Sequence, residues 1–362
     1  MQKIPLVDVK GTFASVRDEV ERAFSDVLDG GQYVRGPQFS AFQDEAAAYL
    51  GVKGSIGVAN GTDALVLVLD AMEIGPGDEV ICPAFTFYAT AEAIARRGAT
   101  PVFADVDPET LNVDPEDVAA KITDRTRAIM PVHLFGRPAA MTELLALGVP
   151  VIEDAAQAFG APGVAQQGLI STYSFFPTKN LFCLGDGGLV ASDDAELVDR
   201  VRMLAFHGSR DKTDFDFVGY NSRLDELQAS FLRIFLTHLD EWNRGRRDAV
   251  ARYAELGLGD LVELPLDEPG HIYHLLVCRS PERDRIRAAL VEAGIGTATY
   301  YTTPLHLQPA LKFLGYEPGS LVETERAATE NFSVPLWPDM PAESQERVVD
   351  VVRSAVGVGA GA

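Results

Sequence analysis

The sequence has 362 residues, of which 47% are apolar and 23% are charged. This length and composition fit about two domains with cores of their own, and they exclude a disordered chain, a collagen and a small disulfide scaffold. Lys and Arg number 31 against 53 Asp and Glu, so the net charge is −22. Because an acidic surface repels nucleic acid and anionic membranes, we expect neither as a partner.

Cysteine spacing and hydropathy bear on the compartment. Cys82, Cys183 and Cys278 form no C-x-x-C pair and are odd in number, so the sequence predicts neither a zinc site nor a disulfide framework. The N-terminal M-Q-K-I-P-L-V-D-V-K becomes polar too early for a secretory signal, and no apolar run approaches the roughly 20 residues of a membrane helix. We therefore expect a cytoplasmic protein with reduced thiols. The terminal G-V-G-A-G-A is expected to be a frayed end.

From about residue 54 to 205, short apolar runs alternate with segments of helical periodicity. The apolar runs predict buried strands at 55–59, 79–83, 100–104, 127–132 and 150–153. The segments between them predict helices at 62–72, 86–97 and 138–147. This alternation predicts an α/β fold, in which helices cover both faces of a parallel sheet.

After Phe206 the pattern changes. Residues 223–256 predict one or two long helices, and a shorter α+β unit follows. Its expected elements are a strand at 271–278 and helices at 283–294, 320–331 and 342–355. We therefore predict a large domain over residues 1–245 and a small C-terminal domain over 246–362.

The first of four chemically informative segments is A-N-G-T-D-A-L (59–65), where a strand ends and a helix begins. The N–H groups of Gly61, Thr62 and Asp63 would lie at the helix N-terminus, where unpaired amides and the helix dipole favour an anion such as phosphate. An ordinary cap made by Thr62 or Asn60 explains the same residues. Taken alone, this segment indicates the ordinary cap.

Two carboxylates and an amide follow the strand predicted at 150–153. Glu153 and Asp154 lie at its carboxyl end, and Gln157 comes three residues later. Ligands of open α/β sheets bind beyond the carboxyl ends of the strands. A carboxylate there can hold a cation or a protonated ring nitrogen, whereas helix-capping carboxylates in solvent give the same sequence pattern.

Lys179 lies within Y-S-F-F-P-T-K-N-L-F-C-L-G-D-G-G (173–188), between an apolar strand and a glycine-rich turn. Most lysines are solvated surface charges, but the flanking F-F-P and L-F-C argue against that interpretation here. Partial burial lowers the pKa of a lysine and makes its amine a nucleophile toward carbonyl groups. A fourth segment, V-G-Y-N-S-R-L-D-E-L-Q-A (218–229), places Asn221 and Arg223 before a long predicted helix.

Together these segments supply what pyridoxal 5'-phosphate needs: a phosphate cradle, a carboxylate for the ring nitrogen, and a lysine to hold the aldehyde as a Schiff base. No metal site is predicted. The chain has no H-E-x-x-H and no helix-opening G-x-G-x-x-G, and His271 and His274 would face opposite sides of a strand.

The ordered motifs resemble the DegT/DnrJ/EryC1/StrS family of sugar aminotransferases, which are fold-type-I pyridoxal-phosphate enzymes acting on nucleotide-linked ketosugars. The resemblance runs from G-G-Q-Y-V-R-G-P (30–37) to N-F-S-V-P-L-W-P (331–338). It includes N-G-T-D-A-L, C-P-A-F-T-F-Y-A-T, E-D-A-A-Q-A-F-G-A, S-F-F-P-T-K-N, G-D-G-G and P-L-H-L-Q. It implies a large domain with a mostly parallel sheet and a smaller C-terminal α+β domain.

The resemblance also implies roles for individual residues. Lys179 would hold the cofactor, Asp154 would pair with its ring nitrogen, and Gln157 would lie near its ring hydroxyl. Phe87 would stack on the ring, although core packing is an alternative for this residue. The implied phosphate ligands are Thr62, Asp63, Ser174 and, from the neighbouring subunit of a homodimer, Asn221. The implied substrate contacts are Tyr33, Arg35 and His306, the last with core packing as its alternative.

The expected reaction moves an amino group from L-glutamate to a nucleotide-linked ketosugar. Lys179 would hold the cofactor and carry the proton, while Asp154 would sustain the electron sink. N-S-R-L-D-E-L-Q resembles the branch that aminates C3, and Arg223 would pair with a substrate phosphate or carboxylate, unless it only caps the following helix. We therefore predict a 3-keto sugar.

Other substrates and functions stay open at this point. The alternative acceptors are a 4-keto-6-deoxy sugar nucleotide and a keto-inositol. The alternative functions are a sugar dehydratase, in which histidine replaces the lysine, and a cofactor-binding sensor without catalysis.

Overall fold

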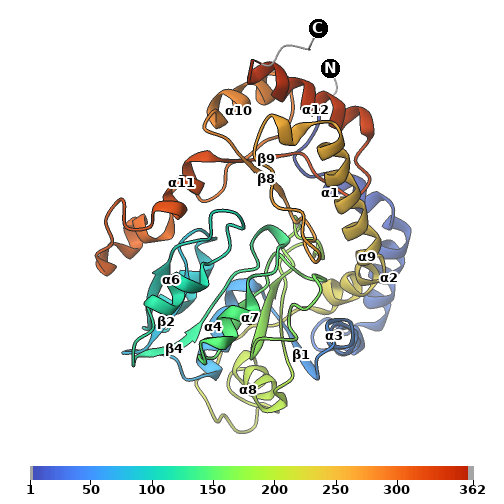
Figure 1. Cartoon of the computed structure of the whole chain (residues 1–362). Coiled ribbons are helices and arrows are strands. Elements are labelled where there is room, and N and C mark those ends of the chain that lie inside the picture. Colours follow the sequence, from blue (N-terminus) through green and yellow to red (C-terminus); the bar gives the residue numbers. More distant parts are fainter. Residues whose placement is uncertain (1–2, 358–362) are drawn as a thin grey trace.

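The computed structural model describes residues 3–357 (Figure 1). In this part of the chain, a four-stranded and a three-stranded group form the central sheet. The strands pair in the orders β3-β2-β4 and β1-β7-β6-β5. Parallel bridges from Ile129 to Val151 and from Val132 to Asp154 join the two groups at β4 and β5. All seven strands are parallel except β7, which is antiparallel to both neighbours. The strands are β1 (Gly54–Val58), β2 (Glu79–Pro83), β3 (Thr100–Ala104), β4 (Thr126–Ile129), β5 (Ile152–Asp154), β6 (Ile170–Ser174) and β7 (Gly188–Ser192).

Helices cover both faces of this sheet, as the alternating sequence pattern predicted. Successive residues of a strand point to opposite faces. Val80 and Cys82 of β2 accordingly belong to the core beneath α4 (Gly61–Ala71) and α5 (Ala89–Arg96). Ile81 belongs to a second core beneath α6 (Pro115–Ala120) and α7 (Met141–Ala146). The predicted α/β fold class is therefore confirmed.

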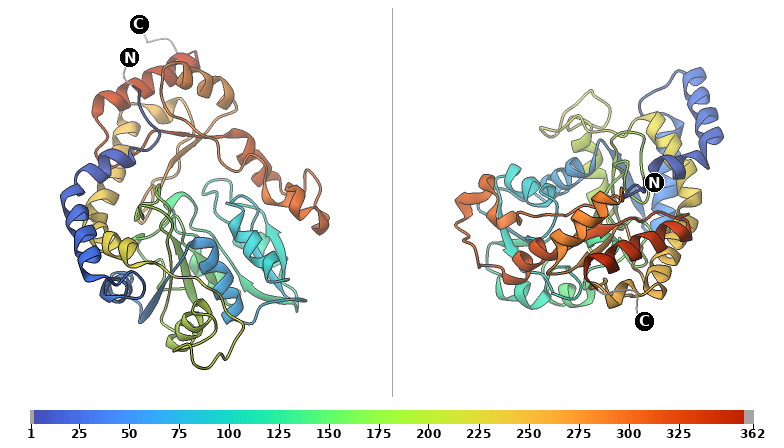
Figure 2. Two further views of the ribbon diagram at one scale, coloured as in Figure 1. Left: turned by 180° about the vertical axis from the view of Figure 1, so that it is seen from behind. Right: turned by 90° about the horizontal axis from the view of Figure 1, so that it is seen from above.

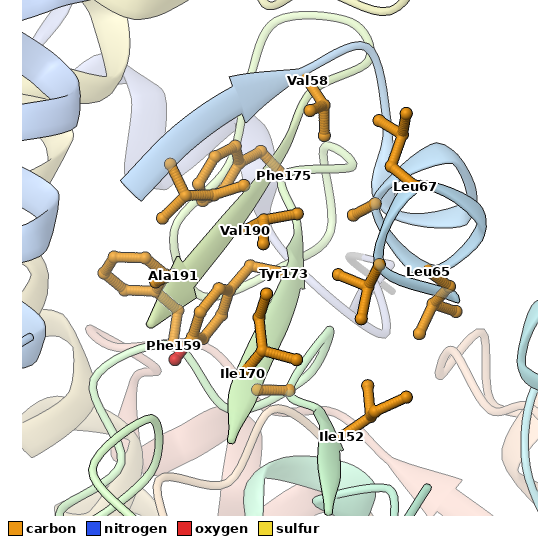
Figure 3. Close-up of a cluster of buried hydrophobic side chains, with 14 of the residues drawn as sticks. Val58, Leu65, Leu67, Ile152, Phe159, Ile170, Tyr173, Phe175, Val190 and Ala191 are labelled. Atoms are coloured by element: carbon orange, nitrogen blue, oxygen red, sulfur yellow. The ribbon is translucent and has the colours of Figure 1, made fainter. Parts of the chain in front are cut away.

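The part of the sheet formed by β1, β7 and β6 packs against α4 through a cluster of buried hydrophobic side chains (Figure 3). Leu65 and Leu67 of α4 face Val190 of β7 and Ile170 of β6 across this cluster. The helix α8 (Ala195–Ala205) completes the cover on that side. This packing fixes where the N-terminus of α4 lies relative to the ends of the strands.

The long helix α9 (Glu226–Glu255) connects the sheet to the C-terminal unit as one continuous helix (Figure 1). Its buried side chains belong to the main core up to Trp242 and to the C-terminal core from Ala249 onward. The predicted boundary at residue 246 falls in this interval and stays a prediction. The N-terminal segment does not follow that division, because Ile4 packs in the C-terminal core and bridges to Ile295.

Three helices at the N-terminus had no counterpart in the sequence interpretation. They are α1 (Val9–Ala14), α2 (Arg17–Gly30) and α3 (Pro37–Leu50). Both α2 and α3 lie beside α9 (Figures 1 and 2). Glu226 at the start of α9 accepts hydrogen bonds from the N–H groups of Gly36, Gln38 and Phe39, which ties the first turn of α3 to α9.

The C-terminal unit contains a two-stranded antiparallel sheet and three helices. They are β8 (Leu276–Arg279), β9 (Asn331–Val334), α10 (Arg283–Glu292), α11 (Val322–Glu330) and α12 (Ala342–Ala355). The prediction of a strand at 271–278 is wrong for residues 271–275, which precede β8. Ile272 and His274 instead donate their N–H groups to the carbonyls of Gly136 and Phe135, next to the short helix η1 (Leu134–Gly136).

Residues 3–357 contain neither a membrane-spanning helix nor a cluster of metal ligands. No helix there combines the length and the apolar character needed to cross a membrane. Within the same range, no three His, Cys, Asp or Glu side chains gather as a metal site. The predicted frayed end lies outside the described residues except for Gly357.

Candidate active site

Asp154 and Glu153 end the buried strand β5 and point to opposite faces of the sheet. Asp154 accepts hydrogen bonds from the Thr90 hydroxyl at 2.9 Å and the Ala156 N–H at 3.2 Å. Burial raises the pKa of the Asp154 carboxyl above its ordinary value. Both carboxylates are buried, with exposures of 4% and 0%, so the interpretation as solvated helix caps is wrong.

Glu153 is fully engaged on the opposite face. It accepts hydrogen bonds from the N–H groups of Gly168 at 2.7 Å and Ala165 at 3.1 Å, and it pairs with His133 at 2.8 Å. Since the Ala139 N–H donates to Nδ1 of His133, the proton of a neutral ring lies on Nε2 and points to Glu153. These partners lower the pKa of Glu153 against the effect of burial. Of the two carboxylates, only Asp154 is therefore a candidate to bind a ligand.

Lys179 lies in the loop that follows β6, on the same side of the sheet as Asp154. Its own N–H donates to the Phe176 carbonyl at 2.8 Å, so the backbone turns back at this point. The surrounding protein removes water from the partly exposed ammonium group and lowers the pKa of Lys179 to about 8, while the charge of Asp154 opposes this shift. A neutral, nucleophilic amine is therefore accessible near neutral pH.

The N-terminus of α4 forms a cradle beside these two residues. Asn60 caps the helix, since its Oδ1 accepts the Asp63 N–H at 2.8 Å. Of the two caps considered from sequence, Asn60 is therefore the one present. In the described part of the chain, neither the Gly61 N–H nor the Thr62 N–H has an acceptor. Such open amides at a helix N-terminus favour an anion.

Glycines allow the surrounding backbone to approach this helix end closely. A Cβ on Gly61 would lie 2.8 Å from the Cβ of Ser174, and one on Gly188 would lie 2.5 Å from the carbonyl of Asn60. Ser174 at the end of β6 therefore lies next to the open amides of α4. Asp63 points elsewhere, because its Oδ2 accepts the Ser222 hydroxyl at 2.6 Å.

Gln157 is already bonded to protein on both ends of its amide. Its Oε1 accepts the Phe135 N–H at 2.8 Å, and its Nε2 donates to the Tyr301 hydroxyl at 3.1 Å. Burial raises the pKa of Tyr301 above its ordinary value, so this hydroxyl keeps its proton. The predicted contact of Gln157 with a ring hydroxyl stays a prediction.

Three residues that contact this site were not identified from the sequence, namely Thr90, Phe135 and Tyr301. Thr90 lies inside a predicted helix, and Tyr301 follows a stretch with no clear pattern. No local signal identifies Thr90, because its partner Asp154 lies 64 residues further along the chain.

The structure distinguishes between the alternatives for Phe87 and Arg223. Phe87 exposes 61% of its surface, so core packing does not explain it. The cap of α9 is Asp225, which accepts the Gln228 N–H at 2.8 Å, so the interpretation of Arg223 as a helix cap is wrong. No described residue forms a hydrogen bond or ion pair with the Arg223 guanidinium.

The remaining predicted substrate contacts lie in different surroundings. Tyr33 and Arg35 are exposed, and the Arg35 guanidinium lies 4.0 Å from the centre of the Phe206 ring. Phe206 in turn bridges to Asn221, whose side chain is exposed. His306 is instead buried and bonds Glu325 at 3.1 Å. The structure therefore gives no support to the predicted contact between His306 and the substrate.

A desolvated lysine, a buried carboxylate and open amides at a helix end meet at one edge of an α/β sheet. Burial raises the pKa of the Asp154 carboxyl, and a protonated pyridine nitrogen beside it would stabilise its charged form. The open amides of Gly61 and Thr62, with Ser174 next to them, fit a phosphate group. Fold and site together define a pyridoxal-phosphate enzyme of fold type I.

Comparison with known proteins agrees with this class. The sequence pattern that defines the DegT/DnrJ/EryC1/StrS aminotransferase family matches residues 14–353. The crystal structure of DesV from Streptomyces venezuelae superimposes with a TM-score of 0.95 and 41% identity, covering 99% of both chains. The protein therefore belongs to the DegT/DnrJ/EryC1/StrS aminotransferase family, and it is an aminotransferase that uses pyridoxal phosphate.

Three relatives match over nearly their whole length. A UDP-N-acetyl-3-dehydro-alpha-D-glucosamine 3-aminotransferase from Acidithiobacillus ferrooxidans is 44% identical, with 97% of both chains covered. A dTDP-3-amino-3,4,6-trideoxy-alpha-D-glucose transaminase from Streptomyces venezuelae is 42% identical, with 97% of this chain and 96% of the relative covered. A protein named as a pleiotropic regulatory protein, from Geobacillus stearothermophilus, is 44% identical, with 96% of this chain and 97% of the relative covered.

Proposed function

We propose that this protein transfers an amino group from L-glutamate to C3 of a nucleotide-linked 3-keto sugar. The observation that carries the transamination chemistry is the pairing of Lys179, with its pKa lowered to about 8, and the buried carboxylate of Asp154. Two similar relatives are named for 3-amino sugars, one linked to UDP and the other to dTDP. They support C3 as the position and leave the nucleotide open.

Each part of the site has a role in this reaction. Lys179 Nζ would hold the cofactor aldehyde, Asp154 the ring nitrogen, and the amides of Gly61 and Thr62 the phosphate, with the Ser174 hydroxyl beside them. Pyridoxal phosphate, when bound, supplies an electron sink for the bond broken at the α-carbon of the donor. Once released, Lys179 Nζ takes the proton from that α-carbon, and a pKa of about 8 leaves the amine both neutral enough to accept it and basic enough to hold it.

The phosphates of a nucleotide-sugar acceptor are negatively charged, so the site needs basic side chains although the chain has a net charge of −22. Arg223 has no ion-pair partner among the described residues. The Arg35 guanidinium contacts the face of an aromatic ring, which leaves its N–H groups available. Both guanidiniums can therefore bind the phosphates of a nucleotide sugar. Tyr33 lies two residues from Arg35 on the same exposed loop. We assign the acceptor nucleotide to this surface. We further propose that a homodimer completes each site, with Asn221 reaching the phosphate held by the partner.

A sensor without catalysis is the second candidate, because one relative is named as a regulatory protein. Such a protein needs the phosphate cradle but neither the lysine nor the ring-nitrogen carboxylate. Lys179 and Asp154 are both present, and both are held in place. A dehydratase with histidine in place of the lysine is disfavoured by Lys179 itself.

The test is turnover of the cofactor-loaded protein with L-glutamate and a panel of acceptors. The panel holds UDP- and dTDP-linked 3-keto sugars, a dTDP-linked 4-keto-6-deoxy sugar and a keto-inositol. We expect 2-oxoglutarate to form with a 3-keto sugar and NMR to locate the new nitrogen on C3. Nitrogen on C4, with no reaction of any 3-keto sugar, would overturn the assignment, and no turnover with any acceptor would favour the sensor.

A further inference from the structure

The residue after the proposed cofactor lysine is held by side chains from two distant segments. Asn180 is 5% exposed and lies in the same loop as Lys179. Its Nδ2 donates to Asn243 Oδ1 of α9 at 2.7 Å and to the Ile272 carbonyl at 3.3 Å. Its Oδ1 lies 3.2 Å from Nδ1 of His274. All the principal hydrogen-bonding positions of this amide are therefore used.

These partners fix both the amide orientation and the tautomer of His274. A backbone carbonyl only accepts, so the group of Asn180 that faces Ile272 is the NH₂, and the oxygen faces His274. That oxygen also only accepts, which places a proton on Nδ1 of His274. His274 is thus the donor that holds the oxygen of Asn180.

His274 is itself held rigidly, although its segment forms no strand. Its N–H donates to the Phe135 carbonyl at 2.8 Å, and the Ile272 N–H donates to the Gly136 carbonyl at 2.9 Å. Gly136 has a φ of 92°, and a Cβ there would lie 2.7 Å from the His274 nitrogen, so glycine permits this close approach. Phe135 is bonded in turn to Gln157. The chain of contacts therefore returns to the proposed cofactor site.

The charges around His274 keep its ring neutral. Lys179 faces it from the loop after β6, and Arg246 faces it from α9 with Nη1 at 3.3 Å from the His274 carbonyl. Burial and these two cations lower the pKa of His274 well below its ordinary value. Asp154 is the carboxylate that acts on Lys179 from β5. A neutral ring with Nδ1–H is a fixed donor that adds no repulsion to the nearby ammonium.

We propose that His274 is a positioning residue for Lys179 and that it acts through the side chain of Asn180. A lysine in a loop samples several backbone conformations unless its neighbours are fixed, and small displacements of a reacting group are costly to catalysis. Asn180 couples the loop to α9 and to segment 271–275, so the backbone next to Lys179 has one arrangement. The inference rests on the proposed role of Lys179 as the residue that holds the cofactor.

Two substitutions that differ by one methylene test this proposal. His274→Asn keeps an N–H donor at the place of Nδ1, whereas His274→Gln carries its amide to the place of Nε2 and leaves the oxygen of Asn180 without a donor. We expect His274→Gln to lower kcat about 10- to 100-fold with KM for both substrates nearly unchanged. His274→Asn should recover most of that loss.

A second readout needs no turnover. In the full chain freed of cofactor, the pKa of Lys179 is measured from the pH dependence of its acetylation, followed by peptide mass spectrometry. In His274→Gln a loosened loop admits water, so the pKa of Lys179 should rise from about 8 toward the ordinary value of 10.5. In His274→Asn it should stay near that of the unmodified chain.

The path through Asn180 is tested by a double-mutant cycle. Asn180→Ala should reproduce the His274→Gln phenotype, and the double variant should be no worse than Asn180→Ala alone. Additive losses would overturn the path, and unchanged kcat and unchanged Lys179 pKa in a folded His274→Gln would overturn the proposal. Asn180→Ala answers the same question if His274→Gln does not fold.

His271→Gln is the matched control, because His271 is an equally buried histidine three residues away whose Nδ1 accepts the Tyr273 N–H rather than bonding Asn180. We expect kcat and the pKa of Lys179 to be unchanged in this variant. Borohydride reduction of the cofactor-loaded enzyme distinguishes the proposed role of Lys179 from the positioning role of His274. Cofactor fixed on another residue would refute the proposed role of Lys179, whereas cofactor fixed on Lys179 with no effect of His274→Gln refutes only the positioning role.

Discussion

Two opposing effects act on the pKa of the Lys179 side chain. Loss of water lowers its pKa to about 8, and the charge of Asp154 raises it, with the loss of water the larger influence. At pH 7 this pKa gives about 300-fold more neutral amine than a lysine at its ordinary value of 10.5. The residue is thus prepared to attack an aldehyde before any ligand binds.

Replacing Lys179 by Ala should therefore abolish the visible absorption of the bound cofactor and lower kcat by at least about 10³-fold. The measurement is an absorption spectrum of the purified protein together with glutamate-dependent turnover. Lys312, at the end of the short helix η4, is a control lysine away from the site. Undiminished transamination by Lys179→Ala would refute the mechanism.

Asp154 is held at a cost to the stability of the protein without cofactor. Its folded pKa lies above the ordinary 3.8, so between these two values the folded chain binds more protons than the unfolded chain. The free energy of unfolding therefore falls as the pH rises through this window, and above the window the cost is fully present. A cationic ring nitrogen in the site would remove that cost.

Asp154→Asn should consequently stabilise the cofactor-free protein by about 1 kcal/mol at pH 7 and lower activity on the order of 10³-fold. The stability difference should disappear below about pH 3, where the carboxyl is protonated in both states. Denaturant unfolding at the two pH values measures the first effect, and turnover measures the second. A variant less stable than the parent at pH 7 would show that Asp154 is compensated within the protein.

At the scale of elements, the site exists because strands and a helix end at one edge of the sheet. Parallel β1, β5 and β6 all direct their carboxyl ends there, and antiparallel β7 begins there. The beginning of β7 lies so close to the first residue before α4 that only glycine fits at position 188. The distance between β7 and α4 therefore controls the phosphate cradle.

Gly188→Ala should weaken cofactor binding about tenfold and destabilise the protein by about 1–3 kcal/mol, because its Cβ would meet backbone atoms of Asn60 that cannot yield without moving α4. Cofactor titration and thermal unfolding measure the two effects. Gly54→Ala on β1 is the matched control, since its Cβ would lie 3.5 Å from Val198, an ordinary contact. Equal behaviour of the two variants would contradict this account of the cradle.

At the scale of the molecule, the proposed homodimer would complete each site with a residue from a second copy. Asn221 has an exposed side chain on a backbone that is fixed by its bridge to Phe206, and Arg35 packs on that same ring. An exposed polar side chain on a rigid backbone is suited to contact another copy of the chain.

Mixing Lys179→Ala chains with Asn221→Ala chains tests this arrangement. If Asn221 serves the partner's site, each mixed dimer has one site with both lesions and one site with neither, so about half of the activity per dimer should return. Separately tagged chains allow the mixed dimer to be purified before the assay. No recovery in purified mixed dimers would show that Asn221 acts within its own subunit.

The local pattern of the sequence was sufficient for most elements and for proposing Lys179 and Asp154 as the central residues of the site. The strands β1, β2 and β3 and the helices α4, α9, α10 and α12 lie where apolar periodicity predicted them, because that periodicity acts over a few residues. Lys179 and Asp154 were identified for a related reason. Chemistry-bearing side chains that directly follow buried strands are visible in the sequence without knowledge of the rest of the chain.

Only the tertiary structure decided the arrangements that depend on distant contacts. It paired Glu153 with His133 and placed Asp154 on the other face beside Thr90. A strand sends neighbouring residues to opposite faces, but its sequence does not say which face holds the ligand. It also turned β7 antiparallel and drew residues 271–275 out of the predicted strand to bond η1. Thr90, Tyr301 and His274 approach the site from positions 64 or more residues away from their partners, and such contacts leave no trace in a local pattern because they are formed by packing of the whole chain.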